Sequence, residues 1–164
     1  PDGLNMSPRR ITISTVGIAK GIIKLADEGK KFNLALSLHA ATDSKRRLIM
    51  DITNSNPIDK VMEAIKYFYE KTGNKITFEY ILFKDINDTR EDAMNLIKLC
   101  KQFPVFVNLI EYNPVEGLSF EKASQENAYM FLRLLESRNI TAKIRVSRGK
   151  DIDAACGQLA NREK

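Results

Sequence analysis

The chain has 164 residues, of which 43% are hydrophobic and 29% are charged, and this balance predicts a single globular domain over residues 1–164. No apolar run is long enough to cross a bilayer and no signal peptide opens the chain, so we expect no membrane contact and a cytoplasmic location. The net charge of +5 weakly favours a polyanionic partner. The two cysteines, Cys100 and Cys156, have neither metal-type spacing nor the pattern of a disulfide framework.

Short β-branched runs alternate with amphipathic stretches along the chain. The runs predict strands at residues 11–15, 34–39, 76–83, 105–111 and 142–147. Apolar residues at helical spacing predict helices within residues 18–28, 43–50, 57–72, 89–103 and 124–135. We expect Asp43 to cap the second helix and Thr89 with Asp92 to open the fourth. Cys100 lies on the apolar stripe of that fourth helix, which predicts a core thiol.

Alternation of this kind predicts parallel strands joined by right-handed crossovers. About five strands cannot close an eight-stranded barrel, which leaves a doubly wound sheet or part of a larger or incomplete barrel. The chain opens with Pro1-Asp2-Gly3 rather than with methionine, which favours a piece of a longer protein and therefore the partial barrel.

Polar residues stand where the predicted strands end, and in both architectures ligands bind at the carboxyl ends of the strands. Ser14, Ser37, His39 and Asn113 hold such positions, and Cys156 follows the last strand. These groups suit ribose hydroxyls, an adenine edge or an amino-acid zwitterion.

The cysteine sits in a turn beside Gly157 and after a basic cluster, which is typical of a nucleophile, although a small residue covering the barrel end is an equal alternative. Each of the other residues also has an ordinary structural explanation: a strand end, a satisfied histidine or a turn. For the arginine pairs at 9–10 and 46–47 the ordinary explanation is a solvated surface.

Five stretches, in order along nearly the whole chain, resemble the RlmN/Cfr family of radical S-adenosylmethionine RNA methyltransferases, and lie closer to its RlmN branch. They are residues 9–15 (RRITIST), 37–40 (SLHA), 78–80 (FEY), 108–114 (NLIEYNP) and 151–159 (DIDAACGQL). The resemblance implies the C-terminal portion of a partial, TIM-like (β/α) barrel. It also implies that S-adenosylmethionine contacts the residues that match the family's binding positions, namely Ser14, Ser37, Leu38, His39 and Asn113.

The resemblance further implies that Cys156 is methylated by one S-adenosylmethionine. A second molecule, cleaved at a [4Fe–4S] cluster, gives a radical that takes a hydrogen from this methyl group, and the carbon then adds to C2 of adenosine in 23S rRNA or tRNA. Transfer through a methylated cysteine and a radical has a chemical reason. The adenine carbon is not nucleophilic and cannot take a methyl group by ordinary displacement. The cluster-binding cysteines, the resolving cysteine, the proton-accepting glutamate and the N-terminal RNA-binding domain of the family have no counterpart in this sequence. We therefore expect this piece alone to bind no cluster, to bind S-adenosylmethionine weakly at best, and not to methylate RNA.

RNA contact is expected at Arg145, Arg148 and Lys150, because they lie close to Cys156 in the sequence. We expect the full-length protein to be a monomer, whereas the piece alone exposes the strand at residues 11–15 as an edge that can pair with another chain. Two other functions stay open. One is a non-catalytic basic RNA-binding module. The other, ranked low, is an unrelated barrel enzyme such as an aldolase that uses Lys75 or Lys143.

Overall fold

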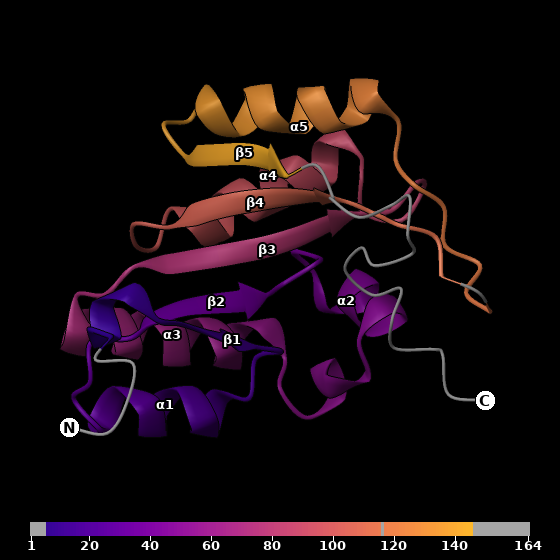
Figure 1. The fold of residues 1–164 in the computed structure, drawn as a ribbon. Helices are drawn as coiled ribbons and strands as arrows, with labels where there is room; N and C mark the ends of the chain where they lie inside the picture. The colour runs from indigo at the N-terminus through magenta and orange to yellow at the C-terminus, as the bar shows by residue number, and fades with distance from the viewer. Residues whose placement is uncertain (1–5, 116, 146–164) are drawn as a thin grey trace.

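The structure is a computed structural model that describes residues 6–115 and 117–145 (Figure 1). Its strands are β1 (Thr12–Thr15), β2 (Asn33–Ser37), β3 (Ile76–Leu82), β4 (Phe106–Glu111) and β5 (Thr141–Arg145). Its helices are α1 (Ala19–Asp27), α2 (Asp43–Ile49), α3 (Ile58–Thr72), α4 (Arg90–Cys100) and α5 (Gln125–Glu136), with 3-10 turns η1 (Pro8–Arg10) and η2 (Asp51–Asn54). None of the helices in this part of the chain is both long and apolar enough to span a membrane.

The strands form one parallel sheet in the order β1-β2-β3-β4-β5, which is also their order along the chain. A doubly wound sheet reverses its strand order at a switch point, whereas a (β/α) barrel progresses in one direction. The observed order therefore decides between the two predicted architectures, and the partial barrel is confirmed. In the described part of the chain the sheet is open, with β1 and β5 at its edges.

The two faces of the sheet differ in polarity because successive side chains of a strand point to opposite sides. Leu36, Phe78, Tyr80 and Leu109 belong to the buried core, together with apolar residues of α1, α3, α4 and α5. These helices wrap around the outside of the sheet (Figure 1). The residues between the core positions point to the other face, and many are polar: Ser14, Ser37, Glu79, Asn108, Lys143 and Arg145.

Two local predictions for α4, its capping box and its core cysteine, agree with the structure. The Thr89 hydroxyl accepts the Asp92 N–H at 3.3 Å while the Asp92 carboxylate accepts the Thr89 N–H at 3.2 Å, so the predicted capping box opens α4. Cys100 at the end of this helix is buried, which confirms the core thiol, and burial raises its pKa to about 12.

Two local predictions were wrong. Asp43 is the first residue of α2, and its carboxylate instead accepts the N–H of Ile58 at 2.8 Å, at the start of α3. Strand β2 ends at Ser37 rather than at His39. The chain turns there, because the Ala40 N–H bonds to the Leu38 carbonyl at 2.7 Å and His39 adopts a positive φ of 55°.

Candidate functional site

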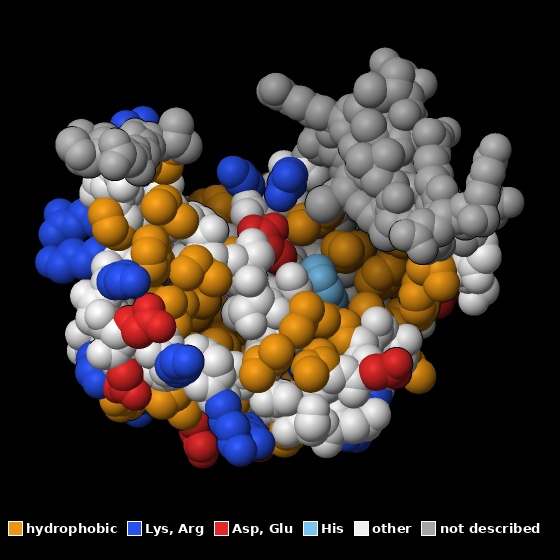
Figure 2. Space-filling model, turned by 60° about the horizontal axis from the view of Figure 1, so that its bottom comes forward, with side chains coloured by type: hydrophobic (Ala, Val, Ile, Leu, Met, Phe, Trp, Pro, Cys, Tyr) orange, Lys and Arg blue, Asp and Glu red, His pale blue; other side chains and the backbone are white. Residues whose placement is uncertain are grey.

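The described residues predicted to bind a ligand lie at the carboxyl ends of the strands. Ser14 lies on β1 on the polar face, Ser37 ends β2, and Asn113 follows the end of β4 and is buried. Leu38 is buried too, whereas the His39 side chain is half-buried. Figure 2 shows the face of the molecule on which the histidine is visible, in pale blue, close to acidic and apolar side chains.

His39 is held in a single orientation by its contacts with β3. Its Nδ1 accepts the N–H of Ile81 at 3.2 Å, so a neutral ring carries its proton on Nε2. Burial, and to a lesser degree the positive charge of Arg46, lower the His39 pKa from 6.5 to about 4. At neutral pH this ring therefore acts as a hydrogen-bond donor through Nε2, and it carries no charge.

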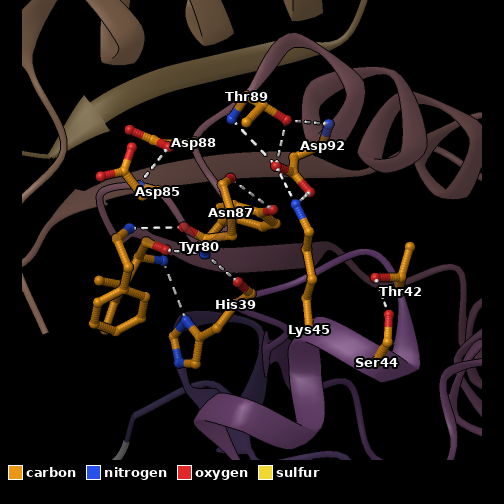
Figure 3. Close-up of polar contacts among 12 residues, drawn as sticks. His39, Thr42, Ser44, Lys45, Tyr80, Asp85, Asn87, Asp88, Thr89 and Asp92 are labelled. Atoms are coloured by element: carbon orange, nitrogen blue, oxygen red, sulfur yellow. Dashed lines mark hydrogen bonds and ion pairs between the residues drawn. The ribbon is translucent and has the colours of Figure 1, made fainter.

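Asn87 fixes the peptide group of this histidine (Figure 3). Its amide nitrogen donates to the carbonyls of His39 at 2.6 Å and Ile81 at 2.7 Å, and its amide oxygen accepts the Phe83 N–H at 2.7 Å. Asn87 is fully buried, so these bonds satisfy three of its four hydrogen-bonding positions. The amide joins the loop after β2 to the end of β3. The sequence alone indicates no role for Asn87, because its contact with His39 spans 48 residues of the chain.

The ordinary explanation of Arg46, a solvated surface residue, does not hold. Its side chain is fully buried and lies between the loops that follow β1 and β2. The guanidinium donates to the carbonyls of Val16 at 2.7 Å, Ser37 at 3.3 Å and Leu38 at 3.1 Å, and to the Thr53 hydroxyl at 3.1 Å. Its partners are thus three backbone carbonyls and one hydroxyl, which hold two of the predicted ligand-binding residues, Ser37 and Leu38, in place.

Gly17 makes room for this arginine. Its φ is 96°, and a Cβ at this position would lie 3.2 Å from the Arg46 Nη2 and 3.3 Å from the Val61 Cγ1. Only glycine combines that backbone conformation with so close an approach.

A polar pair crosses the middle of the polar face of the sheet. The register places Ser37, Glu79, Asn108 and Lys143 side by side on β2, β3, β4 and β5. The amide nitrogen of Asn108 donates to Glu79 Oε1 at 2.7 Å. The other oxygen of each side chain is buried without a hydrogen-bond partner in the described structure. Glu79 and Asn108 stand in stretches that carried the family resemblance, but the sequence alone indicates no role for them.

The remaining predictions fall partly outside the structure. Cys156, Arg148 and Lys150 lie outside the described residues, and Arg145 ends β5 with an exposed side chain. Lys75 and Lys143, the alternative catalytic lysines, are described. Lys143 is exposed, and its Nζ lies 5.4 Å from the centre of the Phe106 ring.

The described residues do not fit an iron–sulfur cluster. No three His, Cys, Asp or Glu side chains among them lie together as a metal site requires. Cys100 is buried in the core, and its raised pKa keeps the thiol protonated, whereas cluster ligation needs thiolates.

Comparison with known proteins shows what the chain is similar to. The chain is 52% identical over 162 residues to a Flavobacterium psychrophilum protein named probable dual-specificity RNA methyltransferase RlmN, a match that covers 99% of this chain and 47% of that protein. The chain is similar to curated RlmN proteins along nearly its whole length. It spans about half the length of the curated RlmN proteins that it matches. No family model matches the chain.

Solved structures agree with this relationship to RlmN proteins. A radical SAM methyltransferase from Sphaerobacter thermophilus superposes with a TM-score of 0.91 and 39% identity, covering 95% of this chain and 46% of that one. A domain of pyruvate-formate lyase-activating enzyme from Bacteroides vulgatus shares the fold alone, with a TM-score of 0.65 and 14% identity over 82% of this chain and 80% of that one. The predicted resemblance to RlmN and the partial-barrel fold are thus confirmed.

Proposed function

We propose that this chain is the C-terminal part of a radical S-adenosylmethionine methyltransferase that methylates C2 of adenosine in 23S rRNA and tRNA. The observation that carries the proposal is the 52% identity to an RlmN protein over 99% of the chain. That span includes both the polar ends of the strands and the segment around Cys156.

The ends of the strands supply groups that suit S-adenosylmethionine. The hydroxyls of Ser14 and Ser37 donate and accept hydrogen bonds, the neutral His39 ring donates through Nε2, and the Asn113 amide does both. Together with Leu38 these residues hold the nucleoside and amino-acid parts of the molecule. When bound, S-adenosylmethionine supplies the methyl group and the radical chemistry that the reaction needs.

Cys156 carries the methyl group to the RNA as S-methylcysteine. A carrier is required because C2 of adenine is not a nucleophile and does not accept a methyl group from a sulfonium ion directly. The residues beside this cysteine, Gly157 and two alanines, are small, which suits a sulfur that has to move during the reaction.

The fragment by itself is inactive in this proposal. Because the described residues do not fit a [4Fe–4S] cluster, we derive no step through that group. The chain alone is expected to bind S-adenosylmethionine weakly and to leave RNA unmethylated. The full-length protein works as a monomer in the cytoplasm, and Arg145, Arg148 and Lys150 contact RNA phosphates.

The test is Cys156→Ala in the full-length protein, with S-adenosylmethionine labelled in its methyl group. The wild-type protein, isolated after turnover, should carry label on Cys156 and release 2-methyladenosine. The variant should form no product and keep its affinity for RNA. Product formation by Cys156→Ala would contradict the proposal. If the wild-type protein binds RNA but never forms product, the alternative, a non-catalytic RNA-binding module, is correct.

A further inference from the structure

We propose that Glu79 and Asn108 together form a subsite that accepts hydrogen bonds from the two ribose hydroxyls of a bound adenine nucleoside. The inference rests on the proposed function, since it presumes that S-adenosylmethionine binds at this end of the sheet. It adds two ligand-binding residues that neither the family resemblance nor the sequence pattern assigned.

The pair is built into the sheet rather than into a loop. Glu79 lies opposite Asn108 in the register between β3 and β4, in the middle of both strands. Their core-facing neighbours Phe78, Tyr80, Val107 and Leu109 are completely buried, which locks both backbones. The next residue across β2 is Ser37, one of the residues expected to bind the nucleoside. A ligand held by Ser37 therefore lies within reach of this pair.

The pair has unused capacity to accept hydrogen bonds. Asn108 is 9% exposed, and its Oδ1 is buried without a partner among the described residues. Glu79 Oε2 is in the same condition, while Oε1 accepts the Asn108 amide at 2.7 Å. Leaving a buried acceptor unpaired costs about 1–3 kcal/mol, and more for a charged group. A protein that keeps two of them side by side gains when a ligand brings donors.

The chemistry of the pair selects the ligand group. Both free atoms are acceptors and one belongs to a carboxylate, so the site repels phosphate. A ribose presents two adjacent O–H donors, and a carboxylate is a usual partner of ribose hydroxyls in nucleotide-binding folds. Lys143 is next in the row, yet its Nζ lies over the Phe106 ring, so it leaves the carboxylate available to the ligand.

An ammonium group could also donate to the pair, and S-adenosylmethionine contains one. Three ligands distinguish binding of the ribose hydroxyls from binding of the ammonium group. S-adenosylhomocysteine carries both the ribose hydroxyls and the amino group, adenosine carries only the hydroxyls, and 2′,3′-dideoxyadenosine carries neither.

The experiment measures the affinity of these three ligands for the full-length protein, comparing wild type with Glu79→Gln. Losing a charge-assisted hydrogen bond should weaken S-adenosylhomocysteine and adenosine by the same factor, roughly tenfold to a hundredfold. Dideoxyadenosine should bind equally well to both proteins. The matched control is Glu63→Gln, on the exposed side of α3, which should leave all three affinities unchanged.

A second measurement separates a binding role from a structural one. Glu79→Gln removes a buried charge and retains the oxygen that accepts from Asn108, so the melting temperature of the unliganded protein should stay the same or rise. A lower melting temperature with unchanged affinities would identify a structural pair and overturn the subsite.

Other outcomes are equally decisive. Loss of affinity for S-adenosylhomocysteine but not for adenosine would assign the pair to the ammonium group and overturn the ribose assignment. If Glu79→Gln changes no affinity while the wild-type protein binds S-adenosylmethionine, the subsite is wrong and the proposed function stands. If the wild-type protein binds neither S-adenosylmethionine nor its homocysteine analogue, both are wrong.

Discussion

His39 illustrates what the surroundings of one residue add to its identity. The sequence predicts its place at the end of a strand, since SLHA follows a continuous apolar run. Its charge state depends on contacts from elsewhere in the chain: the Ile81 N–H occupies Nδ1, and the buried Arg46 lies near enough to disfavour a second positive charge. The result is a neutral ring with one fixed donor.

This state makes stability depend on pH. Between pH 6.5 and about 4, the unfolded chain binds a proton on His39 that the folded chain does not bind. The stability that depends on a neutral His39 is therefore fully present above pH 6.5. As the pH falls towards 4, the free energy of unfolding decreases by up to about 3 kcal/mol. Urea denaturation over this range should show a shallower pH dependence in His39→Asn than in wild type. Asparagine tolerates the positive φ and still offers an acceptor. Identical slopes for the two proteins would count against the lowered pKa.

At the scale of elements, Arg46 joins segments around the ends of β1 and β2. It lies on α2 and bonds to the loop after β1, the end of β2 and η2. The ends of β1 and β2 carry Ser14 and Ser37, so the geometry of the candidate site depends on this side chain. A buried arginine without a carboxylate partner is costly, and it is stable here because carbonyl oxygens surround it.

Arg46→Met should lower the free energy of unfolding by roughly 3–5 kcal/mol, because it leaves the carbonyls of Val16, Ser37 and Leu38 without their donor. Arg47→Met, at the neighbouring exposed position, is the matched control and should change it by less than about 0.5 kcal/mol. Chemical denaturation of the full-length protein measures both. Equal effects from the two substitutions would mean that the buried hydrogen bonds carry little stability.

At the scale of the whole molecule, the two edges of the sheet differ in the polarity of their side chains. Beside β1 lies a groove of about 350 Å³ whose lining is mostly apolar, with Ile13, Ile18 and Leu25, and also includes Lys24 and Glu28. Edge strand β5 exposes Thr141, Lys143 and Arg145 instead. Charged side chains discourage pairing along an edge, whereas an apolar edge favours it. Association of the 164-residue chain is therefore expected through β1.

Thr12→Lys, on the exposed side of β1, should shift the isolated 164-residue chain from dimer to monomer. Thr141→Lys places the same charge on the opposite edge and should leave the dimer intact. Sedimentation velocity distinguishes the two states. A wild-type chain that stays monomeric at high concentration, or a dimer that only Thr141→Lys disrupts, would contradict the assignment of the edge.

Local patterns determined much of this protein. The alternation of strands and helices, the capping box at Thr89, the core position of Cys100 and the family resemblance all follow from neighbouring residues, because hydrophobic periodicity and capping depend on spacings of a few positions. The same patterns located Ser14, Ser37 and Asn113 near the ends of their strands.

The tertiary structure decided what depends on partners distant in the chain. Strand order chose the partial barrel over a doubly wound sheet. Arg46 is buried because carbonyls from two loops reach it, although next to Arg47 it reads as a surface residue. Glu79 and Asn108 are 29 residues apart, and only the register of β3 with β4 places them together. Pairing across a sheet is set by long-range packing, and no local spacing encodes it.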